Sequence, residues 1–435
     1  MAPGHHPRPT MIDFLTLDDL DIAGKKVFAR VDVNTPVDPE TGRLLELNRI
    51  REASVTIRAL SESAVIVASH QGRVGRNDYI SLRQHSEALS QVLGKNVRFV
   101  EDVFGEAARS KIDQLGKGEI LMLENLRFAA EENYEYSFAE ACRTHFVSCL
   151  APHLEACVLD AFPTAHRAHP SIVGFAEILP TCAGLLVTRE LKSLSRIVAT
   201  SKAPYTAVLG GAKISDRLEA IDALIENGKA DNVLLTGLVA MVFLRAANIL
   251  KTSPDPQTDK YVPRAAELLS KYRDNFYLPE DVAVLKNGER VEVDVSKLDG
   301  SSQVLDIGEK TIAKYSKIIK SSGTVFMSGP PGAFERKGFE KGTHDLLMAT
   351  ATSLGTTIVS GGHLSAAMEI LGVKEWVDHV STAGGALVLF LAGKKLPLIE
   401  ALVRGLGLVG CDDKGWCKRL RDDWKKGGRG GGKAE

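Results

Sequence analysis

Short apolar runs rich in β-branched residues recur along the chain, and each is followed by a stretch with the spacing of an amphipathic helix. Such runs predict strands, and strands that alternate with helices are typical of βαβ units, which form parallel sheets with both faces covered. Twelve strands are predicted, at 26–34, 64–70, 96–102, 119–125, 157–162, 205–211, 232–237, 275–284, 304–308, 324–329, 356–362 and 378–382. Because one open sheet rarely holds so many strands, the pattern indicates two sheets and hence two α/β domains.

The segment at 178–198 is the candidate boundary between these domains. It opens with a turn that contains Pro180 and Gly184 and continues as an amphipathic helix. The pattern fits a stiff connector between domains and an ordinary helix of one domain equally well. As a connector, it divides the chain into an N-terminal domain at 12–180, a connecting helix at 181–198, a C-terminal domain at 199–400 and a C-terminal segment at 401–435 that ends in a basic, glycine-rich tail.

The overall charge is close to zero, since the formal net charge of the 435 residues is -1. The chain therefore has no global attraction for nucleic acid or for an anionic membrane, and any anion site is local. Its 44% hydrophobic and 25% charged residues are typical of soluble globular proteins. Six scattered cysteines indicate reduced thiols. We find neither a signal peptide nor an apolar run of 18 residues, and we expect a cytoplasmic protein.

Basic and polar side chains gather where the predicted strands of the first half end. Ligands of open parallel sheets bind beyond the carboxyl ends of the strands, and arginine forks match carboxylate and phosphate oxygens. An arginine taken singly is more often a surface or salt-bridged residue, but several at one edge favour a binding site. They predict a small, highly anionic substrate. The candidates are Asp32, Asn34, His70, Arg73, Asn125, Arg127, His166, Arg167 and His169, joined by Arg49 from the start of the next helix.

In the second half the strand ends collect glycines instead. Glycine lets the backbone approach a phosphate or a flat base closely, and consecutive N–H groups form an anion nest. Each loop alone is more often a tight turn, but together they outline a nucleotide site. The positions are Gly210, Gly211 and Lys213, then Gly237, then Gly329, Pro330 and Gly332, then Gly361 and Gly362, and finally Gly384 and Gly385, where a helix start would face a phosphate.

Two common nucleotide-binding motifs are excluded. The chain has no G-x-x-x-x-G-K-[ST] sequence, so it is not a P-loop NTPase. Its G-x-G-x-x-G match, GLGLVG at 405–410, follows a helix-like stretch instead of a strand, so we interpret it as chance. An anion pocket on one domain and a nucleotide pocket on the other indicate a kinase that closes to bring the pockets together and to exclude water.

A set of motifs in a fixed order identifies the family that the chain resembles. They are RVDVNTP, NRIR, SHQGR, LENLRF, DAFPTAHRAH, GGAKISD, SGPPGAFE, SGGH and STAGGA, spread over nearly the whole chain from Phe14 to about Leu402. These sequences resemble phosphoglycerate kinase, and SHQGR, LTGLVA and GGALVLFLAGKKLP resemble its archaeal branch. The resemblance implies an α/β fold of two doubly wound parallel-sheet domains joined by a hinge helix.

The resemblance also implies the reaction. Family members transfer a phosphoryl group reversibly from 1,3-bisphosphoglycerate to Mg-ADP, giving 3-phosphoglycerate and Mg-ATP, in glycolysis and gluconeogenesis. The substrate-binding positions that it implies are Asp32, Asn34, Arg49, His70, Arg73, Arg127 and Arg167. The implied catalytic positions are Arg49, Lys213, Gly362 and Gly385, and the nucleotide-binding ones are Gly210, Gly211, Lys213, Arg217, Gly237, Pro330, Glu335, Gly361, Gly362, His363 and Leu364.

Five positions depart from the family's usual motifs, one of them Ala383, which leaves the glycine-rich STGGGA motif one glycine short. Arg217 stands where many members carry a second lysine, and Ser328 where most have asparagine. His363 replaces the Mg²⁺-binding aspartate of bacterial and eukaryotic members, and Leu364 replaces a threonine. Neutral imidazole is a poor ligand for Mg²⁺, so the protein's own metal ligands stay unassigned. Either nucleotide oxygens and water hold the Mg²⁺, or another carboxylate does.

These departures leave two alternatives to an active phosphoglycerate kinase. One is a catalytically weak relative that acts as a binding or scaffold protein, and the other is a kinase for another small acid phosphate. The complete set of basic positions, together with Lys213, favours the active kinase. The expected partners are the two substrates, with no nucleic acid and no membrane, and the protein is expected to be a monomer or a homodimer.

Overall fold

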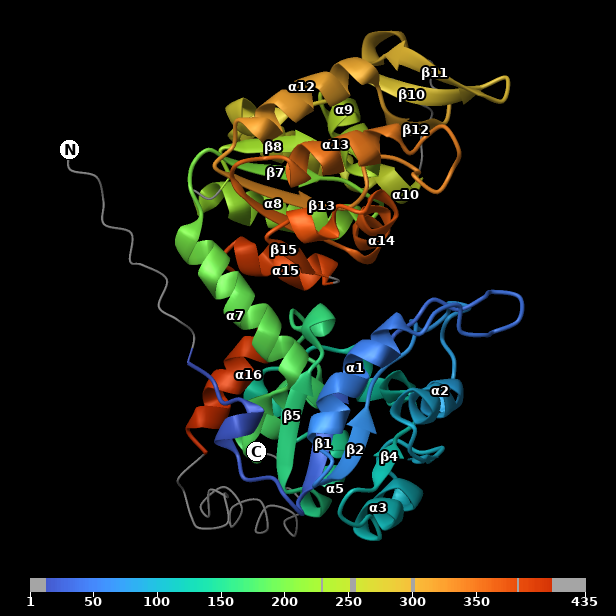
Figure 1. The fold of residues 1–435 in the computed structure, drawn as a ribbon, viewed down its shortest axis with the longest axis vertical. Helices are drawn as coiled ribbons and strands as arrows, with labels where there is room; N and C mark the ends of the chain where they lie inside the picture. Colours follow the sequence, from blue (N-terminus) through green and yellow to red (C-terminus); the bar gives the residue numbers. More distant parts are fainter. Residues whose placement is uncertain (1–12, 228–229, 251–255, 299–301, 382, 409–435) are drawn as a thin grey trace, which may run out of the picture. The chain divides into compact units, whose positions relative to one another are not determined.

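The computed structural model describes residues 13–227, 230–250, 256–298, 302–381 and 383–408. The tail at 409–435, with Cys411 and Cys417, lies outside the described residues, as does the start before Asp13. The described chain forms two compact units (Figure 1). The N-terminal unit comprises the described residues up to Lys192 and those from Leu396 onward, and the C-terminal unit comprises Ser193–Lys395. Helix α7, Leu185–Thr200, continues from the first unit into the second.

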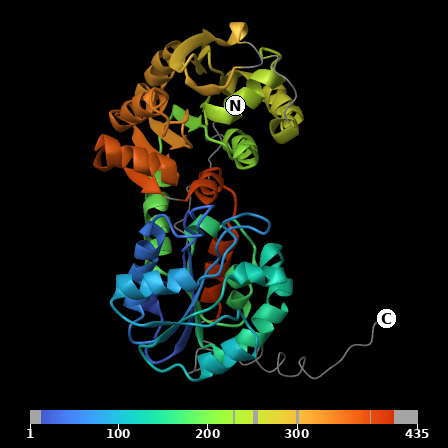
Figure 2. The same cartoon turned by 90° about the vertical axis from the view of Figure 1, so that its right-hand side faces the viewer.

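The N-terminal unit is built on a six-stranded parallel sheet in the order β3-β4-β2-β1-β5-β6. Its strands are β1 Lys26–Val31, β2 Ala64–Ala68, β3 Val97–Phe99, β4 Ile120–Met122, β5 Ala156–Asp160 and β6 Thr181–Ala183. Helices cover both faces of this sheet (Figure 2). They are α1 Asn48–Ala59, α2 Arg83–Leu93, α3 Glu106–Asp113, α4 Phe138–Ala141, α5 His145–Leu150, α6 Pro170–Val173 and α16 Pro397–Leu406.

Neighbouring residues of β1 enter the two cores of this unit, because side chains alternate along a strand. Val27 packs in the core that holds Ile57 of α1 and Leu89 of α2. Phe28 points to the other face, where its ring centroid lies 6.2 Å from that of Phe146 on α5. The strands β1, β2 and β5 are buried along nearly their whole length. A run that is apolar on both faces is what a central parallel strand requires.

The C-terminal unit contains a second six-stranded parallel sheet, in the order β15-β14-β13-β7-β8-β9. Its strands are β7 Tyr205–Leu209, β8 Asn232–Leu235, β9 Phe276–Tyr277, β13 Thr324–Ser328, β14 Thr356–Ser360 and β15 His379–Ser381. Its helices are α8 Ile214–Glu226, α9 Gly237–Ala246, α10 Pro256–Asp259, α11 Val262–Lys271, α12 Glu309–Lys320, α13 Lys341–Ala351, α14 Gly362–Leu371 and α15 Gly384–Leu391. The predicted fold class, two α/β units with parallel sheets, is confirmed.

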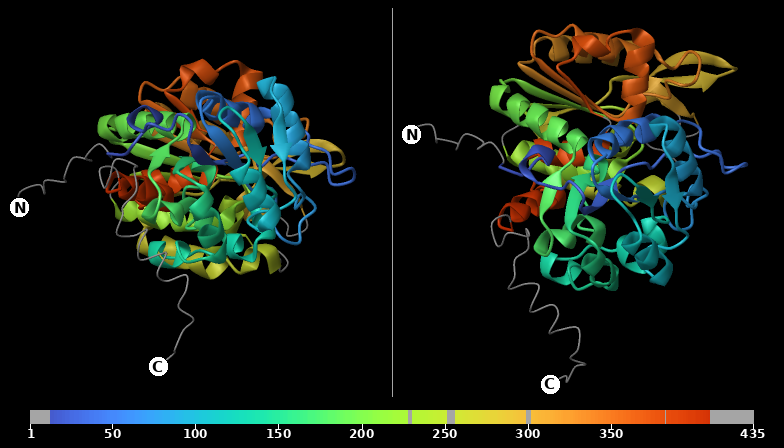
Figure 3. Two further views of the ribbon diagram at one scale, coloured as in Figure 1. Left: turned by 90° about the horizontal axis from the view of Figure 1, so that it is seen from below. Right: turned by 60° about the horizontal axis from the view of Figure 1, so that its bottom comes forward.

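The C-terminal unit also carries a three-stranded antiparallel sheet that the pattern does not predict. Its order is β11-β10-β12, with β10 Asp281–Lys286, β11 Glu289–Asp294 and β12 Val304–Ile307. The right-hand view of Figure 3 shows the β10–β11 hairpin projecting from this unit. The single strand expected at 275–284 is wrong, because β9 and β10 belong to different sheets. Pro279, which lies between them, lacks the N–H that a continuous strand would need.

The segment between the units also differs in detail from the helix expected at 181–198. Thr181–Ala183 form β6, which pairs with β5, and α7 begins only at Leu185. The carboxylate of Asp160, at the end of β5, accepts hydrogen bonds from the N–H groups of Leu186 (2.9 Å) and Val187 (3.0 Å). It therefore satisfies N–H groups that a helix start leaves without partners. Burial raises the pKa of the Asp160 carboxyl to about 6.

Helix α16 belongs to the N-terminal unit, although it follows the C-terminal unit in the sequence. It packs against β6, α6 and the short 3-10 helix at Phe175–Glu177. Gly405 permits this close approach, because a Cβ at that position would lie 2.5 Å from the carbonyl oxygen of Thr181. Arg404 also forms an ion pair with Glu177.

The described residues bear on two further expectations, the lack of a membrane-spanning helix and the reduced state of the cysteines. None of the helices there is long and apolar enough to span a membrane. Cys142, Cys149, Cys157 and Cys182 are free thiols. The residues Gly405 and Leu406 of the GLGLVG sequence fall at the end of α16, and the rest of that match up to Leu408 follows the helix.

Candidate active site

The loops that follow β1 and β2 are joined by polar side chains at the carboxyl edge of the N-terminal sheet. Asp32 follows β1 and forms an ion pair with Arg49 from the first turn of α1. The other carboxylate oxygen of Asp32 accepts the N–H of Asn34 (3.0 Å), and the side-chain oxygen of Asn34 accepts the N–H of Gly72 (2.9 Å). Gly72 has a φ of 66°, and a Cβ there would overlap the carbonyl of Asp78. This turn therefore requires glycine.

Two buried amides hold these loops in place. Gln71 Nε2 donates to the carbonyl of Thr35 (2.9 Å), and Gln71 Oε1 accepts the N–H of the same residue (2.9 Å). Asn125 Nδ2 donates to the carbonyl of Gln71 (2.8 Å). His85 Nε2 lies 3.0 Å from Gln71 Oε1, and burial lowers the pKa of His85 to about 4, so the neutral imidazole donates this bond. Asn125, a strand-end candidate, is fully buried and joins these loops through its side-chain amide.

Two histidines of the predicted site, His70 and His169, are buried next to cations. Burial and the charge of Arg30 lower the pKa of His70 well below its usual value. The same causes lower the pKa of His169 to about 3. Arg30 Nη2 lies 3.2 Å from Nδ1 of His70. Because arginine only donates, the neutral imidazole accepts this hydrogen bond at Nδ1.

Arg30 is a fully buried arginine that an inspection of strand ends does not identify, because it lies inside β1. Its Nε donates to the hydroxyl of Ser171 (2.9 Å), and that hydroxyl donates to the carboxylate of Glu132 (2.8 Å). Burial lowers the pKa of Arg30 and raises that of Glu132, while the opposite charges partly offset both shifts. Arg30 and Glu132 thus form a buried charged support beneath His70. Its sequence signal is the single arginine in the apolar run KVFARV.

Arginine side chains converge around Arg127, which follows β4. Burial, and then the charges of Arg30, Arg73 and Arg167, lower the pKa of Arg127 to about 10. Arg73 is exposed, and Arg167 forms an ion pair with Glu135 at the surface (3.0 Å). The binding of a polyanion would relieve the repulsion among these cations. We call Arg30, Arg73, Arg127 and Arg167 the basic cluster, and it fits the small, highly anionic ligand expected from the sequence.

In the C-terminal unit, the loops after β7, β8 and β13 interlock through glycine. The N–H of Gly211 donates to the carbonyl of Pro330 (3.0 Å). A Cβ on Gly329 would overlap the carbonyl of Gly210, and a Cβ on Gly237 would lie 2.7 Å from the backbone nitrogen of Gly211. These glycines therefore allow backbone to pack on backbone. They shape the surface on which a nucleotide would lie.

The glycines after β14 and β15 differ, because they face open space. Among the described residues, a Cβ on Gly361, Gly362 or Gly384 would meet nothing within 4 Å beyond the adjoining chain. Gly361 has a φ of 111° and directly precedes α14, and Gly384 begins α15. Since β14 and β15 are adjacent strands, the two helix N-termini lie at the same edge of the sheet. Their N–H groups and dipoles favour an anion such as phosphate.

Two basic residues near the start of α8 have different environments. Lys213 immediately precedes the helix, and its side chain is exposed to solvent. Arg217 is only 4% exposed, and its Nε donates to the carbonyl of Gly210 (3.4 Å). Burial lowers the pKa of Arg217 to about 10. Arg217 therefore supports the glycine loop from inside, whereas Lys213 is accessible to a ligand.

The remaining nucleotide-site candidates surround these loops. Leu364 is fully buried in the core between the sheet and α13 and α14, so a ligand contact by this residue has to come from its backbone N–H. His363 is exposed, and its ring centroid lies 6.1 Å from that of Phe334. Glu335, next to Phe334, is exposed. Ser328 is fully buried at the end of β13, and its hydroxyl has no partner among the described residues.

The described residues contain no group of three or more His, Cys, Asp and Glu side chains that could hold a metal ion. Mg²⁺ prefers oxygen ligands and commonly binds one or two carboxylates together with substrate phosphates.

Comparisons with known proteins agree with this geometry. Residues 17–394 match the family model of phosphoglycerate kinase. The phosphoglycerate kinase of Methanothermobacter thermautotrophicus is 41% identical over 402 residues, which cover 91% of this chain and 98% of that protein. That of Methanosarcina mazei is 42% identical over 400 residues, covering 90% and 96%. The crystal structure of phosphoglycerate kinase from Pyrococcus horikoshii OT3 superposes with a TM-score of 0.81 at 36% identity, covering 90% of this chain and 99% of that one.

Proposed function

Because this chain belongs to the phosphoglycerate kinase family, whose members are glycolytic kinases, we propose that its two units each bind one of the two substrates. The reaction is the reversible transfer of a phosphoryl group from 1,3-bisphosphoglycerate to ADP, giving 3-phosphoglycerate and ATP. In the proposal, the N-terminal unit binds the phosphoglycerate and the C-terminal unit binds the nucleotide. The observation that carries it is the basic cluster, in which Arg30, Arg73 and Arg167 lie close enough to Arg127 to add to the lowering of its pKa by burial.

We assign the roles within the N-terminal unit by chemistry. His70, Arg73, Arg127 and Arg167 hold the phosphate that is not transferred and the anionic end of the glycerate. Asp32 accepts a hydrogen bond from the glycerate hydroxyl group, and the side-chain N–H₂ of Asn34 donates to the carboxyl region of the glycerate. Arg49 contacts the transferring phosphoryl group. The ion pair between Arg49 and Asp32 supports this assignment, because it places a cation beside the acceptor that would hold the substrate.

The roles within the C-terminal unit follow the two kinds of glycine loop. The interlocked loops around Gly210, Gly211, Gly237 and Pro330 form the surface for adenosine, and Glu335 holds the ribose. The open helix starts at Gly361, Gly362 and Gly384, with the N–H of Gly385 beside the last, bind phosphate oxygens, and Lys213 guides the transferring group. Three further residues complete the site. Arg217 supports the glycine loop, His363 contacts the ligand with its ring, and Leu364 contributes its backbone N–H.

The transfer needs no general base. In the direction that consumes ATP, the nucleophile is the carboxylate of 3-phosphoglycerate, which is ionised at pH 7 because carboxyl pKa values lie near ~4. The chain therefore has to align the two substrates and to neutralise charge on the phosphoryl group. Arg49, Lys213 and the helix start at Gly385 supply positive charge for that purpose.

We further propose that Mg²⁺ reaches the site as part of the nucleotide substrate, held by phosphate oxygens and water. We place the protein in the cytoplasm, as a monomer or a homodimer, with α7 as the hinge between the domains. Nucleic acid and membranes are not among its proposed partners.

The proposal is tested by a coupled assay with 3-phosphoglycerate, ATP and Mg²⁺ on the full chain. The unmodified protein is expected to consume ATP, and Lys213→Ala and added EDTA are each expected to remove that activity. Lys202→Ala serves as the matched control, because Lys202 lies outside the proposed site, and it should keep the parent rate. A folded parent protein that shows no activity would refute the proposal and favour a scaffold role. Faster turnover of another acid phosphate would indicate a different substrate.

A further inference from the structure

The C-terminal unit contains a buried ion pair that is not part of the proposed substrate contacts. Asp306, on β12, is 2% exposed, and its carboxylate lies 2.8 Å from Nη1 of Arg290 on β11. Burial raises the pKa of Asp306, and the guanidinium of Arg290 partly offsets that shift. Both residues belong to the three-stranded antiparallel sheet. We define the nucleoside segment as residues 329–342, which carry Pro330 and Glu335.

Asp306 bonds directly to the end of this segment. Its Oδ2 accepts the N–H of Gly342 (2.7 Å), and its Oδ1 accepts the N–H of Ile307 (2.9 Å). A Cβ on Gly342 or on Gly332 would overlap the carboxylate of Asp306. Two glycines, one near each end of the segment, therefore leave room for the same carboxylate.

Arg290 reaches the middle of the segment. The nitrogen Nη1 that pairs with Asp306 also donates to the carbonyl of Gly338 (3.1 Å), and Nη2 donates to the carbonyl of Ile307 (3.0 Å). The guanidinium carbon lies 5.8 Å from the ring centroid of Phe339. The N–H of Ala333 donates to the carbonyl of Leu305 (2.7 Å), next to Asp306. The segment is thus fixed at its start, its middle and its end by β11 and β12.

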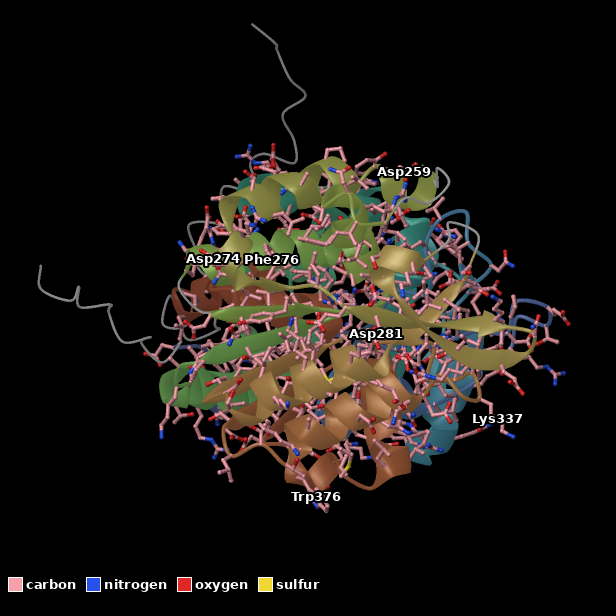
Figure 4. The ribbon with its side chains drawn as sticks, turned by 90° about the horizontal axis from the view of Figure 1, so that it is seen from above. Asp259, Asp274, Phe276, Asp281, Lys337 and Trp376 are labelled. Atoms are coloured by element: carbon pink, nitrogen blue, oxygen red, sulfur yellow. The ribbon has the colours of Figure 1, made fainter. Side chains whose placement is uncertain are left out.

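The part of the segment between these attachments is exposed. Glu335, Arg336 and Lys337 are exposed, and Lys337 lies at the rim of the unit in Figure 4, whereas Asp281 lies within it. The antiparallel sheet is held together by backbone pairing of β10 with both β11 and β12. The side-chain bonds from this sheet to Gly338 and Gly342 are additional to that pairing.

We propose that Asp306 and Arg290 are positioning residues for nucleotide binding: they hold the nucleoside segment so that Pro330 and Glu335 meet the adenosine. This inference rests on the proposed function, since that proposal assigns Pro330 and Glu335 to the nucleoside. It gives the antiparallel sheet a role in the affinity of the nucleotide site. Neither residue is among the proposed substrate contacts.

The test measures ADP binding to the full chain by calorimetry, alongside the KM for 3-phosphoglycerate. Asp306→Asn keeps the shape but presents an N–H₂ group where the carboxylate accepts bonds, and the loss of charged hydrogen bonds should weaken ADP binding about tenfold. Arg290→Lys keeps the positive charge but loses the planar guanidinium that bonds several groups at once, so a smaller loss of ADP affinity is expected. The KM for 3-phosphoglycerate should stay within about twofold in both variants, because its proposed residues lie on the other unit.

Glu292→Gln is the matched control. Glu292 accepts a hydrogen bond from Nε of the same arginine (2.8 Å) and another from the N–H of Glu309 (3.3 Å), and both donors lie outside the nucleoside segment. Its ADP affinity should equal that of the parent. Unchanged ADP affinity in folded Asp306→Asn, or an equal loss of affinity for both substrates, would overturn the positioning role. If Asp306→Asn does not fold, Arg290→Lys provides the test instead. Unchanged ADP affinity in that variant, or an equal loss of affinity for both substrates, would overturn the positioning role. A parent chain that binds no ADP would instead refute the proposed function.

Discussion

The ion pair between Arg49 and Asp32 links two residues with different proposed duties. Asp32 is nearly buried and holds the N–H of Asn34, so it is fixed by the β1 loop. Arg49 lies in the first turn of α1 and is more exposed. An arginine that is already oriented by a carboxylate loses less conformational entropy when it contacts a phosphoryl group. The pair therefore presents a preorganised cation at the edge of the sheet.

Replacing Arg49 tests its proposed contact with the transferring group. Arg49→Ala is expected to lower kcat by roughly 10³–10⁵, as for the loss of an arginine finger, because charge on the phosphoryl group is no longer neutralised. ADP affinity, measured by calorimetry, should stay within about threefold, because a contact made to the transferring group alone does not hold ADP. A kcat equal to that of the parent would show that Arg49 has another role.

His169 should make the N-terminal unit sensitive to acid. In the unfolded chain this histidine takes up a proton below its ordinary pKa of 6.5, and in the folded chain only below about 3. Between these values the unfolded state binds more protons, so the free energy of unfolding falls as the pH is lowered. From pH 6.5 to 4.5 the contribution of His169 is about 2 kcal/mol.

His169→Gln removes that contribution, and the acid-induced decrease in unfolding free energy should shrink by the same amount. Hydrogen exchange of the amides in β1 and β5 reports on this unit alone. His145→Gln, which changes an exposed histidine of the same unit, should leave the decrease unaltered. Identical pH profiles for His169→Gln and the parent would contradict the low pKa of His169.

The sequence predicts which candidate residues lie at strand ends, but it does not predict which of their side chains are buried. The rule that ligands lie beyond the carboxyl ends of parallel strands places Asp32, His70 and Arg127 at one edge. It does not show that Asn125 differs from these residues: its buried amide bonds to the backbone of Gln71 and Ile80 in the loop after β2. It also misses Arg30, because the partners of a buried charge come from distant residues such as Glu132. Such partners are fixed only when the loops fold together.

At the scale of elements, the surroundings of the glycines distinguish loops that pack on one another from loops that face open space. The loops around Gly210 and Gly329 need glycine for contact with one another, and those around Gly361 and Gly384 leave open space. A glycine-rich sequence looks the same in both cases. The distinction depends on which strands are neighbours, since β7 lies beside β13 and β14 lies beside β15. The sequence therefore predicts the glycine loops as a group but not their separate duties.

The strands were predictable where apolar runs are long. β6 has only the three residues Thr181–Ala183, and β11 alternates charged and apolar residues that are mostly half-exposed. Neither resembles the buried runs that identify β1 or β13. Both depend on a neighbouring strand, β5 or β10, for their backbone hydrogen bonds. Edge strands of this kind are set by tertiary pairing more than by local sequence.

The attachment of α16 to the N-terminal unit can be tested at Gly405. Gly405→Ala would put a Cβ 2.5 Å from the carbonyl oxygen of Thr181. Such overpacking should destabilise the contact between α16 and β6 by about 1–3 kcal/mol. Hydrogen exchange in β6 and α16 measures the change. Val403→Ala, at an exposed position of the same helix, should have little effect, and equal protection in the two variants would contradict the close contact.

At the scale of the whole molecule, the family match ends before the tail. It covers residues 17–394, and the described chain continues to Leu408 at the end of the α16 region. All proposed contacts to substrates lie within the matched residues. We expect deletion of residues 412–435 to leave kcat and both KM values within about twofold, measured in the coupled assay. A large loss of kcat would show that the tail takes part in catalysis.

The return of α16 to the N-terminal unit also has a consequence during synthesis. A ribosome that adds about 5–20 residues per second needs roughly 10–40 s to make the intervening Ser193–Lys395. For that time β6 and α6 exist in the nascent chain without the helix that covers them. The first unit to be translated is therefore the last to be completed, and its uncovered face is open to chaperones or to aggregation until Leu406 has emerged.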